Sequence, residues 1–445
     1  MRARLLFIPL TGALCLACGS DGEPRPAPPA TSADPRQNVL VIDDGFDPGH
    51  PALAGRVAAQ YQVTCPRPDP VEIVPRPEPP EVRRAAVLAE LAARDESCHL
   101  QPGIPPKPDP LADVSTYRPA WNRLVEQQRP PDEVFTPAQQ QAILRGQQLS
   151  RGRYHGTATA GLVAHANPNV RLVLVELMLG AVDDERPVTC RGQEDYDATV
   201  ALFSDPEVAR AYVERPPSAL DQEIADVEAS HRVGLRNESF GYPRRAVVEA
   251  ALPALGCSRV DLRAYYVLRG ELDRRRAEAH PGSPVLVMKS AGNDGAELAG
   301  PEDSFECSLR SPLRLVVGAY DLAGQRASFS NAGPCVDVSA PGVNVIAPLP
   351  GGWLMPVDGT SFSAPLLVRL VSLEAGPFDP AAARQAVLDG RDAGGRIPFA
   401  RFPRELFYDP GRISDHWALT VREARVLDRR ALRRLNALLA LGRRP

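Results

Sequence analysis

The stretch "NVLVIDDG", residues 38 to 45, decides the fold. It is a continuous apolar run that ends in two acids and a glycine. A run without polar alternation is typical of a strand that is buried on both faces of a parallel sheet. In open α/β sheets, ligand and catalytic groups gather at the carboxyl ends of such strands. The stretch therefore predicts a buried strand with a polar site at its end.

Further apolar runs of this kind follow along the chain, at "VRLVLVELM" (170–178), "SPVLVMKSAGN" (283–293) and "LRLVVGAYD" (313–321). Helical patterns lie between them, notably at 221–232 and 260–279. Strands that alternate with helices predict an α/β domain with a doubly wound, mostly parallel sheet and helices on both faces. We expect this domain to span residues 38–376.

Residues 66–150 do not fit the alternation, and we interpret them as a large Pro-rich insertion. Many of the 47 prolines lie there. Within it, Thr136-Pro137-Ala138-Gln139 predicts a helix start, because it is a capping box with proline at the first helical position. Residues 377–445 are predicted to form a helical extension. Its basic amphipathic end either lies on a membrane surface or packs on the domain with a solvated arginine face.

The first 18 residues have the layout of an export signal, with Arg2 and Arg4 before a short apolar run. The segment "LCLAC" resembles a bacterial lipobox, which would make Cys18 the lipid-attachment residue, although Cys15 stands where leucine is usual. Residues 19–37 then predict a Pro-rich tether. We expect an extracytoplasmic lipoprotein held on a membrane by its lipid anchor; simple secretion is the alternative.

Composition sets two further expectations. The formal net charge of −4 argues against a nucleic-acid partner, and 44% hydrophobic residues allow a large soluble core. After the signal there are six cysteines, an even number in a compartment that permits disulfides. Six cysteines allow 15 connectivities. We expect sequential pairing, of Cys65 with Cys98, Cys190 with Cys257 and Cys307 with Cys335.

Ser361, in "VDGTSFSAPLL" (357–367), has two interpretations. It is either the N-cap of a helix, a position that serine favours, or a nucleophile beside a helix N-terminus that stabilises negative charge. A nucleophilic serine needs a general base and a group that orients the base. His155, in "YHGTATAGLVAHA", and Asp43 can supply them, in the chain order Asp, His, Ser.

With these segments the sequence resembles the subtilisin-like serine peptidases. The similar segments are "VIDDGFDPGHPAL", "HGTATAGLVA", "NESFG" (237–241), "SAGN" (290–293) and "GTSFSAP", in the order of the family. The resemblance implies a subtilisin-like fold and a serine endopeptidase acting on peptides or proteins. Two alternatives remain open: a catalytically silent binding protein, and an exopeptidase or peptide-cyclising relative.

The resemblance also implies roles for single residues. Asp43 would orient His155, His155 would activate Ser361, and Asn293 would assist the backbone N–H of Ser361 in an oxyanion hole. The cleft that binds the substrate would be lined by Ser239, Phe240, Gly241, Ser290, Ala291 and Gly292. No cofactor and no metal ligand is assigned.

Three positions depart from the family pattern. Ala52 stands where an aspartate ligates calcium in relatives, which puts that calcium site in doubt. Arg236 replaces an apolar residue, and a buried arginine needs a partner, for which Glu238 is the candidate. Asp44 follows Asp43 directly, as in kexin-like members, and would favour basic substrate side chains near the scissile bond.

Overall fold

The fold is seen in a computed structural model, within the unit of the chain that runs from Arg36 onward. The described residues are 36–64, 98–106, 109, 111–151, 155–177, 219–240, 244–254, 262–263, 266–267, 270–271, 284–308, 311–374 and 378–409. The export signal with Cys18, nearly all of the tether and the basic amphipathic end of the chain lie outside these ranges, so those predictions stay predictions.

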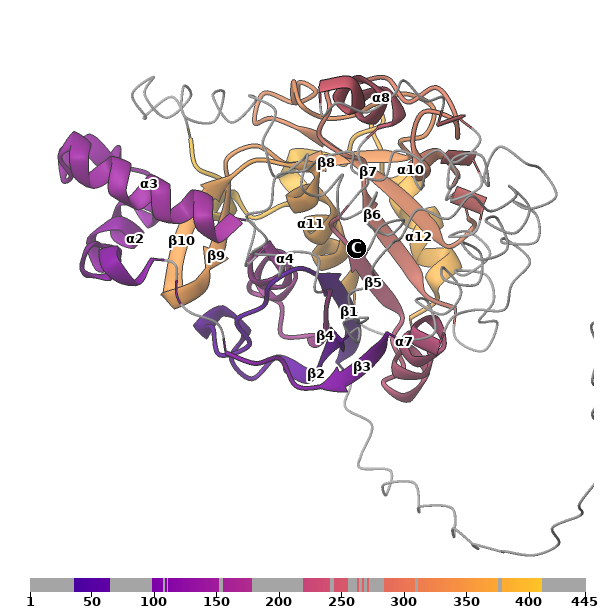
Figure 1. Ribbon diagram of the computed structural model, residues 1–445, viewed down its shortest axis with the longest axis horizontal. Coiled ribbons are helices and arrows are strands. Elements are labelled where there is room, and N and C mark those ends of the chain that lie inside the picture. The colour runs from indigo at the N-terminus through magenta and orange to yellow at the C-terminus, as the bar shows by residue number, and fades with distance from the viewer. Residues whose placement is uncertain are drawn as a thin grey trace, which may run out of the picture. The chain divides into compact units, whose positions relative to one another are not determined.

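An eight-stranded sheet forms the centre of the fold (Figure 1). Its order is β3-β2-β4-β1-β5-β6-β7-β8, and each neighbouring pair is parallel except β2 with β3. The strands are β1 (Gln37–Asp43), β2 (Val57–Thr64), β3 (His99–Pro102), β4 (Val170–Glu176), β5 (Leu235–Glu238), β6 (Leu286–Ser290), β7 (Arg314–Tyr320) and β8 (Val338–Pro341). A separate antiparallel hairpin consists of β9 (Val345–Leu349) and β10 (Trp353–Val357). The predicted mostly parallel sheet is confirmed.

The apolar run of β1 is continuous because both faces of the strand are covered. Val39 and Val41 belong to one hydrophobic core and Leu40 and Ile42 to another. Successive side chains of a strand point to opposite faces, so a strand covered on both sides has no place for polar alternation.

Helices lie on both faces of the sheet. The α-helices are α2 (Arg118–Glu126), α3 (Pro137–Arg151), α4 (His155–Ala164), α7 (Ala219–Ser230), α8 (Arg245–Ala254), α10 (Phe305–Ser308), α11 (Thr360–Ser372) and α12 (Pro380–Asp389). Short 3-10 helices occur at Pro51–Leu53, Ala112–Tyr117, Pro131–Glu133, Pro350–Gly352, Phe399–Arg401 and Arg404–Leu406. Side chains of α4 and α11 belong to the first core and Val227 of α7 to the second.

Two parts of the insertion are placed differently: β3 joins the central sheet beside β2, and α2 packs on the β9–β10 hairpin (Figure 1). The Trp121 ring lies 6.4 Å from the Trp353 ring, centroid to centroid, and Trp121 Nε1 donates to the Leu354 carbonyl at 3.0 Å. The capping box is also confirmed: Thr136 N donates to Gln139 Oε1 at 2.8 Å, and α3 begins at Pro137.

Residues 378–409 contribute to the same core as α11. After α12, the N–H of Ile397 donates to the Ser339 carbonyl at 2.9 Å, and Phe407 and Tyr408 are buried. These contacts join the segment to β8 and to the loop before β9. Within the described ranges, no helix combines the length and apolar character that crossing a bilayer requires.

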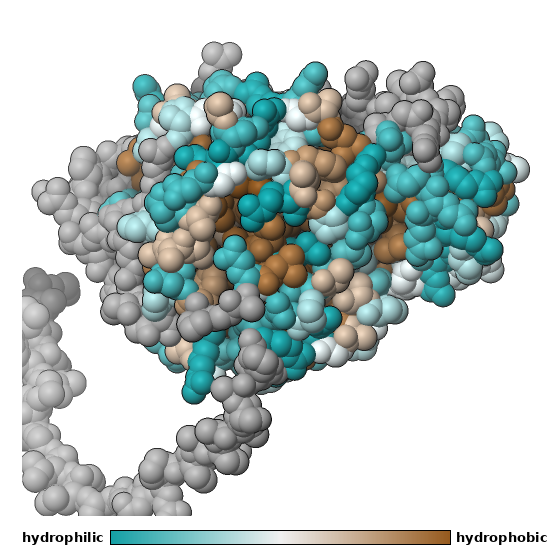
Figure 2. All heavy atoms as spheres, turned by 180° about the vertical axis from the view of Figure 1, so that it is seen from behind, coloured by the Kyte–Doolittle hydropathy of each residue, from teal (hydrophilic) through white to brown (hydrophobic). Residues whose placement is uncertain are grey.

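The face opposite to that of Figure 1 is mixed in polarity. Apolar residues appear near its centre and hydrophilic residues surround them (Figure 2). In the part of the chain that is described, only Val134 and Val267 are exposed large apolar residues.

Cys307 and Cys335 form a disulfide, as sequential pairing predicts. Cys98 is also disulfide-bonded. Cys65, Cys190 and Cys257 lie outside the described residues, so the other predicted pairs stay predictions.

Candidate active site

Strand register brings the site together. Asp43 ends β1, Ser239 follows β5 and Ser290 ends β6, and the residues before them are paired across these three parallel strands. Strand β1 lies between β4 and β5, where the strand order turns to the other side of the sheet. In doubly wound sheets this switch point opens a crevice at the carboxyl ends of the strands.

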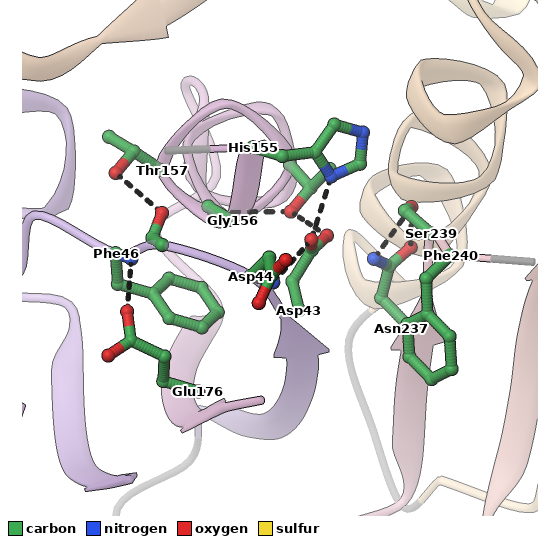
Figure 3. Close-up of polar contacts among 12 residues, drawn as sticks. Asp43, Asp44, Phe46, His155, Gly156, Thr157, Glu176, Asn237, Ser239 and Phe240 are labelled. Carbon is green, nitrogen blue, oxygen red and sulfur yellow. Dashed lines mark hydrogen bonds and ion pairs between the residues drawn. The ribbon is translucent and has the colours of Figure 1, made fainter. Parts of the chain in front are cut away.

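Asp43 and His155 form a hydrogen-bonded pair at this switch point (Figure 3). His155 Nδ1 lies 2.7 Å from Asp43 Oδ1, and the Asp43 side chain is 1% exposed. A carboxylate only accepts hydrogen bonds, so Nδ1 carries the proton and Nε2 is left as the basic nitrogen. The pair thus has the geometry of a base and its orienting acid.

Thr159 is a member of this arrangement that our sequence analysis missed. Its Oγ1 lies 2.9 Å from Asp43 Oδ2 and 3.1 Å from the Gly156 carbonyl, and the charged acceptor makes the stronger bond. The backbone N–H of Asp44 donates to Asp43 Oδ1 at 2.7 Å. Thr159 follows His155 by four positions on α4, the spacing that puts two side chains on one helix face. That spacing is the signal that could have found it.

The loop after β1 is tied to the start of α4 and the end of β4 (Figure 3). Gly156 N donates to the Asp44 carbonyl at 2.7 Å, and Asp47 N donates to Thr157 Oγ1 at 2.7 Å. The buried Glu176 accepts the N–H of Phe46 at 2.9 Å. These bonds hold α4, and with it His155, against the end of β1.

Ser361 is the second residue of α11, and the N-cap position belongs to Gly359. The capping interpretation of Ser361 is therefore wrong. In the first turn of a helix the backbone N–H groups lack intrahelical acceptors, so the N–H of Ser361 can donate outward. Pro365 lies inside the same helix and has no N–H for the Ser361 carbonyl.

Asn293 and His155 contact the two chain neighbours of Ser361. Asn293 Oδ1 accepts both the N–H and the hydroxyl of Thr360, each at 2.9 Å. The His155 ring lies 5.5 Å from the Phe362 ring, centroid to centroid. No hydrogen bond joins the Ser361 hydroxyl to His155 here; in substrate-free sites such bonds are often long and tighten on binding.

The predicted cleft residues follow β5 and β6. Ser239, Ser290 and Ala291 are buried, and the Ser239 hydroxyl accepts a hydrogen bond from Asn237 Nδ2 at 2.9 Å (Figure 3). Phe240 is partly buried, and the Lys289 ammonium lies 4.0 Å from the centre of its ring. Gly241 lies outside the described residues.

A buried charge cluster lies beside these strands. Arg236 Nε is 3.0 Å from Glu238 Oε1, an ion pair whose N–H does not point along a hydrogen bond, and Arg236 also pairs with Glu228 at 2.7 Å. The predicted partner of Arg236 is thus confirmed. The structure adds Lys289 and Arg314, each 3.6 Å from Glu238.

The pKa of Glu238 results from two opposing effects. Burial alone would raise it, but the attraction of Arg236, Arg314 and Lys289 outweighs burial and lowers the pKa to about 2. Glu238 is thus a carboxylate at neutral pH. Among the described residues, no group of three or more His, Cys, Asp or Glu side chains is placed to hold a metal ion.

Comparison with known proteins finds a family model and several relatives that match this chain. The model of the "Subtilase family" matches residues 36–374. Subtilisin of Bacillus pumilus is 41% identical over 91 residues, 20% of this chain and 32% of that protein. Subtilisin E of Bacillus subtilis (strain 168) is 40% identical over 91 residues, 20% of this chain and 23% of that protein. The matched segment therefore covers about a quarter to a third of these relatives.

Solved structures are also similar to the chain. A cold adapted subtilisin-like serine proteinase is 14% identical and aligns over 82% of this chain and 86% of its own, with a TM-score of 0.37. The PatG macrocyclase domain is 17% identical over 85% of this chain and 90% of its own, with a TM-score of 0.40. Because the family model matches more than half of the chain and includes Asp43, His155, Asn293 and Ser361, the chain belongs to the subtilase family.

Proposed function

We propose that this subtilase is a serine endopeptidase that hydrolyses peptide bonds with Asp43, His155 and Ser361. The observation that carries the proposal is the 2.7 Å pair of buried Asp43 with His155, at the switch point of the sheet. His155 and Asn293 both contact direct chain neighbours of Ser361.

The chemistry then follows from the roles of these groups. His155 Nε2 takes the proton of the Ser361 hydroxyl as its oxygen attacks the scissile carbonyl carbon, and Asp43 stabilises the imidazolium that forms. His155 gives this proton to the leaving amine, and a water molecule then releases the acyl group from Ser361 by the same steps.

The oxyanion of each tetrahedral intermediate would be bound by Asn293 Nδ2 and the backbone N–H of Ser361. Asn293 Oδ1 is already occupied by Thr360, which turns the amide nitrogen away from that contact. In subtilisin, loss of the equivalent donor costs roughly 100-fold to 1000-fold in kcat, and we expect a loss of this order for Asn293→Ala.

An extended peptide would bind along Ser239 to Gly241 and Ser290 to Gly292 by strand addition. The support is that β5 and β6 are adjacent and parallel. The two segments at their carboxyl ends therefore lie at the same edge of the sheet. Among these residues, the buried Ser239 and Ser290 would contribute mainly backbone groups.

Labelling of Ser361 with a fluorophosphonate tests the proposal. We expect the mature protein to be labelled and Ser361→Ala to remain unlabelled. Ser363→Ala is a matched control in the same helix, because the Ser363 hydroxyl is buried and makes no hydrogen bond. Absence of any label that depends on Ser361 would instead support a binding protein without catalysis.

Product analysis tests whether the enzyme cleaves inside a peptide, as an endopeptidase does. Incubation with a mixture of blocked peptides should yield internal cleavage, detected by mass spectrometry. Blocked peptides that stay intact while unblocked ones are shortened from one end, or cyclised products, would contradict it.

The lipid anchor is a separate proposal, supported by the segment around Cys18. Expression in a bacterial host with a labelled fatty acid should label the wild-type chain and leave Cys18→Ser unlabelled. An unlabelled wild-type protein in the medium would instead support secretion.

A further inference from the structure

We propose that Asn331 is a positioning residue that holds the oxyanion loop, residues 291–296, in the geometry that Asn293 needs. The inference rests on the proposed function, because it assigns Asn331 a role in the same reaction. Asn331 is 2% exposed and lies in the loop before β8, outside the segments from which we predicted site residues.

The Asn331 side-chain oxygen binds the oxyanion loop after Asn293. Its Oδ1 accepts the N–H of Asp294 and the N–H of Ala296, each at 3.1 Å. An amide oxygen with two acceptor positions is filled by these two donors. The path of the chain directly after Asn293 is therefore set by one side chain.

The side-chain nitrogen and the backbone N–H of Asn331 bind the oxyanion loop before Asn293. Its Nδ2 donates to the Ala291 carbonyl at 2.9 Å, and its backbone N–H donates to the Gly292 carbonyl at 3.1 Å. Nδ2 also lies 3.3 Å from Asp294 Oδ2. Asn331 thus binds the chain on both sides of Asn293. We call these hydrogen bonds between Asn331 and residues 291–296 the clasp.

The fit between the loop and Asn331 is close. Gly292 has φ +92°, and a Cβ at this position would lie 2.6 Å from Asn331 Nδ2. Only glycine combines this backbone conformation with such an approach. Gly292 N also donates to Thr360 Oγ1 at 3.1 Å, which ties the loop to the start of α11 next to Ser361.

Asn331 is itself linked to strand β7 through its neighbour Ser330. The neighbouring Ser330 hydroxyl accepts the N–H of Ala319 in β7 at 2.8 Å and donates to the Asn331 carbonyl at 2.9 Å. A few residues further on, the Cys307–Cys335 disulfide anchors the same loop. The clasp is therefore attached to a rigid part of the molecule, which is what precise placement of a catalytic group requires.

A kinetic double-mutant cycle tests the proposal. We expect Asn331→Ala to lower kcat about 10-fold to 100-fold, the effect of a misplacement of roughly 1 Å, with KM changed less than about 3-fold. In an Asn293→Ala background, the same substitution should have little further effect, since the group that it positions is gone. An equal loss of kcat in both backgrounds, or a loss confined to KM, would overturn the proposal.

Asn167→Ala is the matched control. Asn167 is likewise buried, donates to Ser372 Oγ at 2.8 Å and accepts the N–H of Asn169 at 3.1 Å, but it lies beyond the other end of α4 from His155. We expect it to lower Tm as Asn331→Ala does and to leave kcat unchanged. Should Asn331→Ala not fold, the cycle is run with Asn331→Ser, which keeps a neutral polar group but is too short to keep all of these hydrogen bonds. A kcat loss that persists with Asn293→Ala would again contradict the role.

Hydrogen exchange separates this proposal from the proposed function. In Asn331→Ala, peptides that cover residues 291–296 should exchange faster than in the wild type, because the N–H groups of Asp294 and Ala296 lose their acceptor. Unchanged exchange would overturn the clasp even in an active enzyme. If the wild type hydrolyses no peptide while the variant still exchanges faster, the proposed function is rejected and the clasp is retained.

Discussion

At the scale of single residues, the site depends on the orientation of one buried carboxylate. Asp43 is almost fully removed from water, and a buried polar group needs hydrogen-bond partners. Asp44, His155 and Thr159 supply the donors. A buried carboxylate that loses one of several donors is both less stable and less firmly oriented.

We predict that Thr159→Val lowers kcat/KM about 10-fold and the free energy of unfolding by about 1.5 to 3 kcal/mol, the usual contribution of a hydrogen bond to a charged group. Valine keeps the shape of the side chain and removes its donor. Steady-state kinetics and urea unfolding measure the two effects. Thr159→Ser keeps the hydroxyl and should stay close to wild type; a Thr159→Val enzyme with wild-type kinetics would contradict the prediction.

At the scale of elements, the short strand β5 contributes side chains to two different faces of the sheet. Asn237 points to one face, and Arg236 and Glu238 point to the other, because side chains alternate along a strand. The register with β6 sets Lys289 opposite Glu238, so the parallel pairing itself creates part of the charge cluster. The strand that leads into the proposed substrate segment is thus supported by ion pairs on one face, and Leu235 packs in the hydrophobic core on the other.

We predict that Glu238 stabilises the protein in a way that acid removes. Its folded-state pKa, about 2, lies below the ordinary value of 4.5. The stabilisation is therefore complete above about pH 4.5 and is lost as the pH falls toward 2; it is on the order of 3 kcal/mol. In urea unfolding, Glu238→Gln should be less stable than wild type at pH 7, by a margin that shrinks toward pH 3.

The control for this experiment is Glu133→Gln, which breaks an exposed ion pair with Arg129. Exposed pairs contribute little, so its stability should follow that of the wild type at each pH. A constant margin between Glu238→Gln and wild type over the whole range would show that the charge of Glu238 is not responsible.

The contact of α2 with the β9–β10 hairpin yields a second element-scale prediction. Trp121 is 1% exposed and packs against Trp353 and Phe135. Trp121→Ala should lower the free energy of unfolding by about 3 to 5 kcal/mol, the range for removal of a large buried aromatic side chain. Trp121→Phe keeps an aromatic ring, loses the bond to the Leu354 carbonyl and part of the packing, and should cost less. Equal losses for both variants would indicate that the hydrogen bond, not the packing, holds α2.

At the scale of the whole molecule, covalent and hydrogen-bonded ties join segments that are distant in sequence. The disulfide of Cys307 with Cys335 closes a loop with a sequence separation of 28. The loop includes β7 and the segment with Asn331, so the disulfide limits the freedom of these two segments in the unfolded chain.

We predict that the double variant Cys307→Ser, Cys335→Ser unfolds with a free energy lower by about 3.5 kcal/mol, from the loop-closure entropy of this separation. Chemical denaturation without reductant measures the difference and leaves the disulfide of Cys98 intact. Wild-type stability of the double variant would show that the tie adds nothing to the folded state.

The sequence by itself determined the class of fold, the strands β1, β4, β6 and β7, and the positions of Asp43, His155, Asn293 and Ser361 within family-like segments. It could do so because buried parallel strands and helix starts leave local patterns, such as the run before Asp43 and the capping box at Thr136. Patterns of this kind need only neighbouring residues.

Only the tertiary structure decided which side chains hold that site together. Asn331 reaches partners 35 to 40 positions away. Lys289 and Arg314 meet Glu238 from different strands. Such contacts depend on strand register and on the path of loops through space. Those are set by the packing of the whole chain and leave no periodic trace in any one segment.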